Sequence, residues 1–119
     1  MITEIAFVGS PVTDLKRARE FYEGVLGLRC TTTDPEAKWV EFEVGNGTFG
    51  IGDYGDQWRP AEGGTMAAFE TSDLPGLVQR VKESGAPVVM DITESPVCHF
   101  AMVQDPFGNT LMLHKRKAE

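Results

Sequence analysis

The sequence predicts an α+β fold in which two βαβββ modules form a curved mixed sheet cup with the helices on the outside. The order strand, helix and three strands occurs twice along the 119 residues. Equivalent positions recur at a spacing of 59 residues. Met66 follows Phe7 at this spacing in the first strands (66 − 7), and Asp73 follows Asp14 at this spacing at the helix starts (73 − 14). We therefore expect a single domain over residues 1–119, with module 1 at about 1–54, a connector at 55–64 and module 2 at about 65–117.

The first module begins with an expected strand at 2–10, which carries Phe7 and ends at Pro11. Thr13 or Asp14 can cap the helix that follows, and Gly27 ends it. Apolar side chains recur along this helix at helical spacing, with either Phe21 or Tyr22 in the stripe.

The segment 38–54 predicts a β-hairpin with Asn46-Gly47 as a two-residue turn. Opposite residues then have numbers that sum to 93, so that Phe42 faces Ile51 and Val44 faces Phe49. Their face is apolar. The other face combines aromatic residues, carboxylates and glycines, and the glycines leave room for a molecule to approach the backbone: Trp39, Glu41, Glu43, Gly50, Gly52 and Tyr54.

The second module repeats the first, with a strand at 65–71, a helix capped by Ser72 or Asp73 and ended by Gly85, and strands at 87–94 and 97–104. The turn 105–109 leads into the last strand, and opposite residues across it sum to 214. Met102 then faces Met112, and Phe100 faces His114.

Composition and charge limit the classes of partner that this chain is expected to bind. The net charge of −7 and the pI of about 4.8 argue against nucleic acid and anionic membrane surfaces as partners. No apolar run is long enough to span a bilayer, and Cys30 and Cys98 do not form a C-x-x-C pair. A cytoplasmic protein with two free thiols is expected.

Three segments resemble the vicinal oxygen chelate superfamily of glyoxalases, extradiol dioxygenases, and fosfomycin and bleomycin resistance proteins. They are FYEGVLGL at 21–28, AAFETSDL at 67–74 and DPFGN at 105–109. The resemblance implies a glyoxalase/bleomycin-resistance-like domain with the βαβββ fold, a homodimer, and a small organic ligand bound inside the cup.

In metal-dependent members of this superfamily, the resemblance implies four histidine or glutamate ligands to a divalent ion. The matching positions here are Phe7, Gly50, Met66 and Met112, none of which suits such an ion. We therefore expect no metal and no cofactor. A divalent metal at a displaced site remains open, with ligands drawn from Glu41 or Glu43, Glu70, Cys98 and His114.

The predicted inward face suits an aromatic or hydrophobic ligand with a few polar anchors. Its members are Phe7, Trp39, Glu41, Glu43, Tyr54, Met66, Ala68, Glu70, Cys98, Phe100, Met102, Met112 and His114. A structural interpretation stands beside this one, in which the apolar members fill the core and the charged members are solvated. Cys98 is either a thiol activated by His114 or a buried, inert thiol.

These observations favour a metal-free, dimeric small-molecule-binding protein of the resistance-protein type. The alternative is a glyoxalase-like lyase, isomerase or dioxygenase, in which Glu43 or Glu70 is the base and His114 is the acid, or a displaced metal takes part. A third hypothesis is a non-catalytic regulator or partner subunit that keeps the fold for dimerisation.

Overall fold

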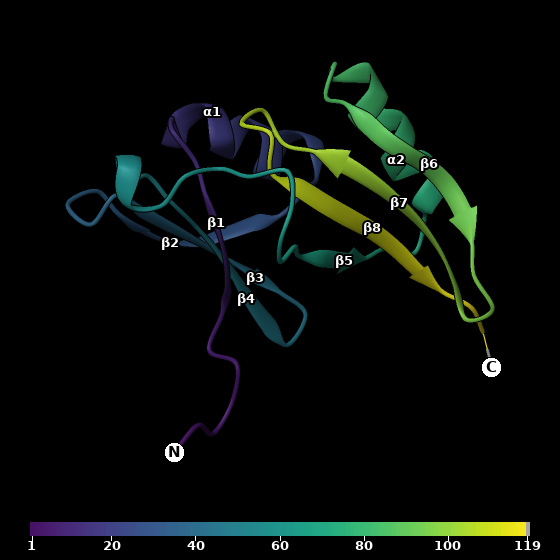
Figure 1. The fold of residues 1–119 in the computed structure, drawn as a ribbon, viewed down its shortest axis with the longest axis horizontal. Helices are drawn as coiled ribbons and strands as arrows, with labels where there is room; N and C mark the ends of the chain where they lie inside the picture. The colour runs from purple at the N-terminus through teal and green to yellow at the C-terminus, as the bar shows by residue number, and fades with distance from the viewer. Residues whose placement is uncertain (119) are drawn as a thin grey trace. The chain divides into compact units, whose positions relative to one another are not determined.

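The computed structural model describes residues 1–118, which divide into two compact units, 1–60 and 61 onward. Each unit contains one four-stranded mixed sheet with helical segments between its first and second strands, as Figure 1 shows. The α+β class and the βαβββ order of both halves are confirmed. The boundary between the units falls inside the segment 55–64 that the sequence predicts as a connector.

The first unit has the strand order β1-β4-β3-β2, with β1 parallel to β4 and the other pairs antiparallel. Its elements are β1 (Val8–Pro11), α1 (Leu15–Arg19), the π-helical η1 (Glu20–Val25), β2 (Arg29–Asp34), β3 (Trp39–Val44), β4 (Gly47–Gly52) and the short 3₁₀ turn η2 (Gly55–Gln57).

The second unit has the equivalent order β5-β8-β7-β6, with β5 parallel to β8. Its elements are β5 (Ala68–Glu70), α2 (Leu74–Glu83), β6 (Val88–Glu94), β7 (Cys98–Gln104) and β8 (Thr110–Arg116). No helix within residues 1–118 is long and apolar enough to cross a membrane.

The internal repeat is confirmed at its helix starts and ends. Asp14 accepts a hydrogen bond from the Arg17 N–H at 3.1 Å, and Asp73 accepts one from the Gly76 N–H at 3.0 Å. Both aspartates are therefore N-caps. Gly27 and Gly85 end the two helical segments with φ of 76° and 84°, a conformation that costs glycine little.

The first strand is shorter than the sequence predicts, because β1 begins at Val8 and not at residue 2. Val8 lies opposite Phe49, only two residues after β4 begins at Gly47, so earlier residues pass beyond the β3–β4 turn and lack a strand to pair with. Ile5 is accordingly 83% exposed. The equivalent strand of the second unit is also short, with β5 at 68–70 in place of 65–71.

The first hairpin has a different register from the predicted one. Trp39 pairs with Gly52 and Phe42 with Phe49, so opposite numbers sum to 91, and the predicted Phe42–Ile51 and Val44–Phe49 pairs are wrong. The turn residues are Gly45 and Asn46, and Gly45 has a φ of 59°. Glycine at the first central position with positive φ is typical of a type II′ turn. The shift is two residues, so each side chain keeps its predicted face.

The segment after Asp14 is α-helical only in its first half and π-helical after Arg19. The Leu26 N–H donates to the Phe21 carbonyl at 3.0 Å, which is an i→i+5 hydrogen bond. Phe21 and Tyr22 are both buried, although an α-helical stripe would take only one of them. The π turn thus adds a second ring to the core of the first unit.

The helical segments cover one face of each sheet and so fix which face is left for a ligand. In the first unit, Tyr22 packs with its ring centroid 5.1 Å from that of Phe49 and 6.1 Å from that of Phe42. The core of the second unit includes apolar residues of α2 and of alternate positions on the strands: Val78, Val81, Ala101, Val103, Leu111 and Leu113.

The second hairpin keeps its predicted register, with Met102 opposite Met112 and Phe100 opposite His114. Its turn is held by the buried Asp105, which accepts hydrogen bonds from the N–H groups of Phe107 at 2.9 Å and Asn109 at 3.0 Å. Its second carboxylate oxygen accepts from the Asn109 side chain at 2.8 Å.

Candidate functional site

Four aromatic rings gather on the face of the first sheet opposite its packed core; we call Phe7, Trp39, Tyr54 and Trp58 the aromatic cluster. Trp39 is parallel to Tyr54 within 3°, with ring centroids 6.5 Å apart. Trp58 lies 6.3 Å from Trp39 and 6.1 Å from Tyr54, inclined by 24° to each. Phe7 meets Trp39 edge to face at 5.2 Å. Offset and edge-to-face pairs at these distances attract one another.

Glycines of β1 and β4 make the room for these rings. A Cβ on Gly50 would collide with Cζ2 of Trp39, and one on Gly52 would lie 2.8 Å from Cε2 of Tyr54. A Cβ on Gly9 would lie 3.0 Å from Cη2 of Trp58. Gly50 and Gly52 are buried beneath the rings. Rings lying this close to the backbone explain why the sheet carries glycine on this face.

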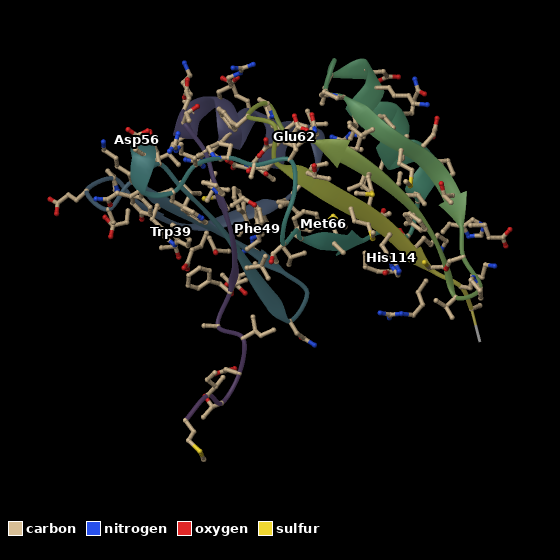
Figure 2. The ribbon with its side chains drawn as sticks, viewed as in Figure 1. Trp39, Phe49, Asp56, Glu62, Met66 and His114 are labelled. Atoms are coloured by element: carbon tan, nitrogen blue, oxygen red, sulfur yellow. The ribbon has the colours of Figure 1, made fainter. Side chains whose placement is uncertain are left out.

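The cluster is open to solvent. Phe7 is 48% exposed and Tyr54 is 38% exposed, while Trp39 and Trp58 are half-buried. Exposed aromatic groups at this density are unusual for a surface without a partner. Trp39, the first residue of β3, is labelled among the side chains of the first sheet in Figure 2.

Trp58 belongs to this cluster although it is not among the site residues predicted from the sequence. After Gly55, which has a φ of 58°, the turn η2 brings the chain back toward β1. The one available signal was a large aromatic residue within an otherwise polar, glycine-rich connector.

The two predicted carboxylates of β3 have different surroundings. Glu41 accepts a hydrogen bond from Nε1 of Trp39 at 2.9 Å, so its carboxylate lies next to the aromatic cluster. Its second oxygen, Oε1, makes no hydrogen bond to any residue from 1 to 118. Glu43 is exposed and accepts instead from the Thr48 hydroxyl at 3.0 Å.

Two open hollows border the cluster. Tyr54 lines one of about 570 Å³ together with Lys38, Asp53 and Asp56. Trp39 lines one of about 620 Å³ on the α1 side, where its neighbours include Arg19 and Glu23, which are paired at 2.5 Å. The hydrogen bond from Arg19 to Glu23 raises the pKa of the arginine, which therefore stays charged.

The predicted site residues of the second unit lie on the sheet face opposite α2. Phe100, Met102, Met112 and His114 are half-buried, and Met66 precedes β5 (Figure 2). Cys98 is buried, and its Sγ lies 3.0 Å from the Ser95 hydroxyl. Cys98 pairs with Arg116, as the predicted register requires, and its Sγ contacts the Ser95 hydroxyl.

Glu70 and His114 form a carboxylate–imidazole pair, with Oε1 of Glu70 2.6 Å from Nδ1 of His114. The other oxygen of Glu70 accepts from the Arg116 N–H at 2.7 Å. The hydrogen bond from Arg116, followed by that from His114, lowers the pKa of Glu70. An ionised Glu70 would hold the Nδ1 proton in place and leave Nε2 of His114 as an acceptor.

The positions that correspond to divalent-metal ligands do not fit such an ion. Phe7 and Gly50 have no side-chain donor, and the thioethers of Met66 and Met112 prefer soft ions. Within residues 1–118, histidine, cysteine, aspartate and glutamate side chains form no group of three that could hold a metal. Of the residues named for a displaced site, Glu70 and His114 are in contact.

Solved structures match this fold over almost the whole chain. A glyoxalase family protein from Bacillus anthracis has a TM-score of 0.81 at 24% identity, with 98% of each chain covered. TnmS3, an antibiotic binding protein from Streptomyces sp. CB03234, has a TM-score of 0.79 at 22% identity, also with 98% of each chain covered.

The fosfomycin resistance protein FosX from Mesorhizobium loti has a TM-score of 0.73 at 20% identity, with 97% of this chain and 93% of that chain covered. At these identities the likeness establishes the fold alone. No curated protein sequence matches the chain. The sequence profile of one family matches residues 4–113, and the chain therefore belongs to the Glyoxalase/Bleomycin resistance protein/Dioxygenase superfamily.

Proposed function

We propose that this protein binds a small, flat, aromatic molecule on the aromatic cluster, without a divalent metal. The observation that carries the proposal is the set of three nearly parallel rings, Trp39, Tyr54 and Trp58, seated over glycine and reachable from solvent. A planar ligand can stack on such rings with little loss of side-chain freedom, because they already restrain one another.

The charges around the cluster favour a cationic ligand. Within residues 1–118, one carboxylate oxygen of Glu41 has no hydrogen-bond donor, and Asp53 and Asp56 line the hollow beside Tyr54. The net charge of −7 adds a long-range attraction for cations. The faces of indole and phenol rings also attract cations directly. A planar cation would thus gain from stacking and from charge at the same place.

The role that we propose is sequestration, in which an antibiotic-like compound is bound and not converted; the structural neighbour described as an antibiotic binding protein supports the binding part of this role. The homodimer and the cytoplasmic location expected from the sequence remain parts of this proposal.

The test is a binding titration followed by tryptophan fluorescence. Bleomycin and proflavine, a planar cation, are compared with naphthalene sulfonate, a planar anion. We expect both cations to bind more tightly than the anion. Trp39→Leu should weaken proflavine binding about 5- to 150-fold, because stacking on an aromatic ring contributes roughly 1–3 kcal/mol.

The matched control is Phe107→Leu, which removes an aromatic ring from the turn of the second unit and should leave the dissociation constant unchanged. A thermal melt of each variant confirms that it is folded. Equal affinity for wild type and Trp39→Leu, or tighter binding of the anion, would refute the proposal.

A second candidate function, lyase or isomerase chemistry, rests on the contact between Glu70 and His114. Glu70 would orient the imidazole, and Nε2 would exchange a proton with substrate. The test substrate is the hemithioacetal of methylglyoxal and glutathione. Turnover that is lost in both His114→Ala and Glu70→Gln would support this function, and absence of turnover by wild type would remove it for this substrate.

A further inference from the structure

Three methionines lie side by side across the second sheet. Met90 of β6 pairs with Met102 of β7, which in turn pairs with Met112 of β8. Directly opposite residues share a face of the sheet, with Cβ atoms about 4.5–5.5 Å apart. The three thioethers therefore form one lateral row, which we call the methionine row.

An irregularity in β6 brings Met90 into this row. Val88 pairs with Val103, whose side chain is in the core beneath α2, whereas Met90 pairs with Met102 on the opposite face. In a regular strand Val88 and Met90 would share a face. The register shift between them turns Met90 to the other side, which is how β-bulges re-aim a side chain.

The methionine row is accessible. Met90 is 44% exposed, and Met102 and Met112 are half-buried, in contrast to the fully buried residues on the α2 side of the same strands. Long thioether side chains with three rotatable bonds can move their sulfur atoms toward a common point.

His114 adds a nitrogen donor next to the row. It lies two residues after Met112 on β8 and so projects from the same face. Nδ1 is engaged by Glu70, which leaves Nε2 as the available atom. A histidine that ligates a metal almost always donates its other ring N–H to a carboxylate or carbonyl in this way.

We propose that the methionine row and His114 form a site for a soft monovalent metal ion, Cu(I). Thioethers select Cu(I) over hard divalent ions, and imidazole is a good copper ligand. The site lies wholly within the second unit and shares no residue with the aromatic cluster, so it stands independently of the proposed aromatic ligand. The ion is taken up as Cu(I) and keeps its oxidation state.

The test uses the full chain with Cys30→Ser and Cys98→Ser, because thiolates would otherwise compete for the ion. Anaerobic competition with the chelator bicinchoninate measures Cu(I) affinity and stoichiometry. We expect one Cu(I) per chain and at least a tenfold loss of affinity in the Met102→Leu/Met112→Leu variant. Leucine conserves volume and keeps the fold, which a thermal melt verifies.

Glu70→Gln tests the positioning role of the carboxylate, and we expect a 10- to 100-fold loss of affinity. Its matched control is Glu94→Gln, a carboxylate of β6 that pairs with Lys117 and should leave affinity unchanged. In methyl-labelled methionine NMR spectra, the redox-inert ion Ag(I) should shift the signals of Met90, Met102 and Met112 and leave that of Met1 in place.

Unchanged affinity in the Met102→Leu/Met112→Leu variant would overturn the proposal. Failure of the cysteine-free chain to take Cu(I) from the chelator would also overturn it. An equal shift of all five methionine signals with Ag(I) would mean adventitious binding only.

Discussion

At the scale of single residues, the aromatic cluster depends on glycine as much as on the rings themselves. Gly50 and Gly52 lie beneath Trp39, and the room that these glycines leave for a group to approach the backbone was expected from the sequence. The occupant of that space is an aromatic side chain of the same chain. The sequence could not show this, because the contacts of Trp58 with Trp39 and Tyr54 depend on the path of the connector.

Replacing Gly50 by alanine tests whether the Trp39 ring packs directly on the backbone of this glycine. The new Cβ would collide with the Trp39 indole, so the ring must move. We expect a loss of about 1–3 kcal/mol in unfolding free energy, typical of overpacking, together with a shifted tryptophan emission spectrum. Gly63→Ala is the control, since nothing lies within 4 Å of a Cβ at that position. Identical emission spectra and stabilities for Gly50→Ala and wild type would contradict the described packing.

At the scale of elements, the two hairpins show when register can be predicted. In the sequence VGNGT, Gly45-Asn46 and Asn46-Gly47 are both good two-residue turns, so local signals do not choose between registers two residues apart. The faces survive such a shift, which is why the aromatic and apolar faces of the first sheet are predicted correctly although the pairs are not. The 105–109 turn has no such rival, because Asp105 binds its backbone at defined positions.

The Asp105 turn should accordingly contribute strongly to stability. Asp105→Ala would leave two backbone N–H groups and the Asn109 amide without their acceptor, and Asn109 is buried. We expect a loss of about 2–4 kcal/mol in a urea unfolding experiment. The comparison variant, Asp73→Ala, removes an exposed helix cap and should cost about 1 kcal/mol. Equal losses of unfolding free energy in the two variants would show that burial of the turn adds nothing to the stability of the protein.

At the scale of the whole molecule, one repeated βαβββ order carries two chemically different sheet faces. The first is aromatic with glycine beneath, and the second is rich in sulfur with a carboxylate–imidazole pair. Periodicity predicted the repeated order of elements and the alternation that places Met102, Met112 and His114 on one face of the second sheet, but not the contributions of Met90 and Trp58. Met90 was missed because a register shift in β6 moves it onto the face of Met102.

The hydrogen bonds of Glu70 also make the stability of the molecule depend on pH in the acid range. Hydrogen bonds from Arg116 and His114 lower the pKa of Glu70 in the folded chain. A lowered pKa means stabilisation above the ordinary glutamate pKa of 4.5, which is lost as the pH falls below that value and through the folded pKa. Urea unfolding across this pH range should show a smaller acid-induced loss of stability for Glu70→Gln than for wild type. The effect should be modest, because the Glu70 side chain is 48% exposed. Parallel pH profiles would contradict the assignment.

The chain carries its own probe for ligand binding at the aromatic cluster, because both of its tryptophans lie there. The measurement is a titration with proflavine followed by the two indole N–H signals in a nitrogen-edited NMR spectrum, assigned with Trp39→Leu and Trp58→Leu. We predict that both signals shift together and saturate at one ligand per chain. Unmoved indole signals, with shifts confined to residues of the second unit, would contradict the account.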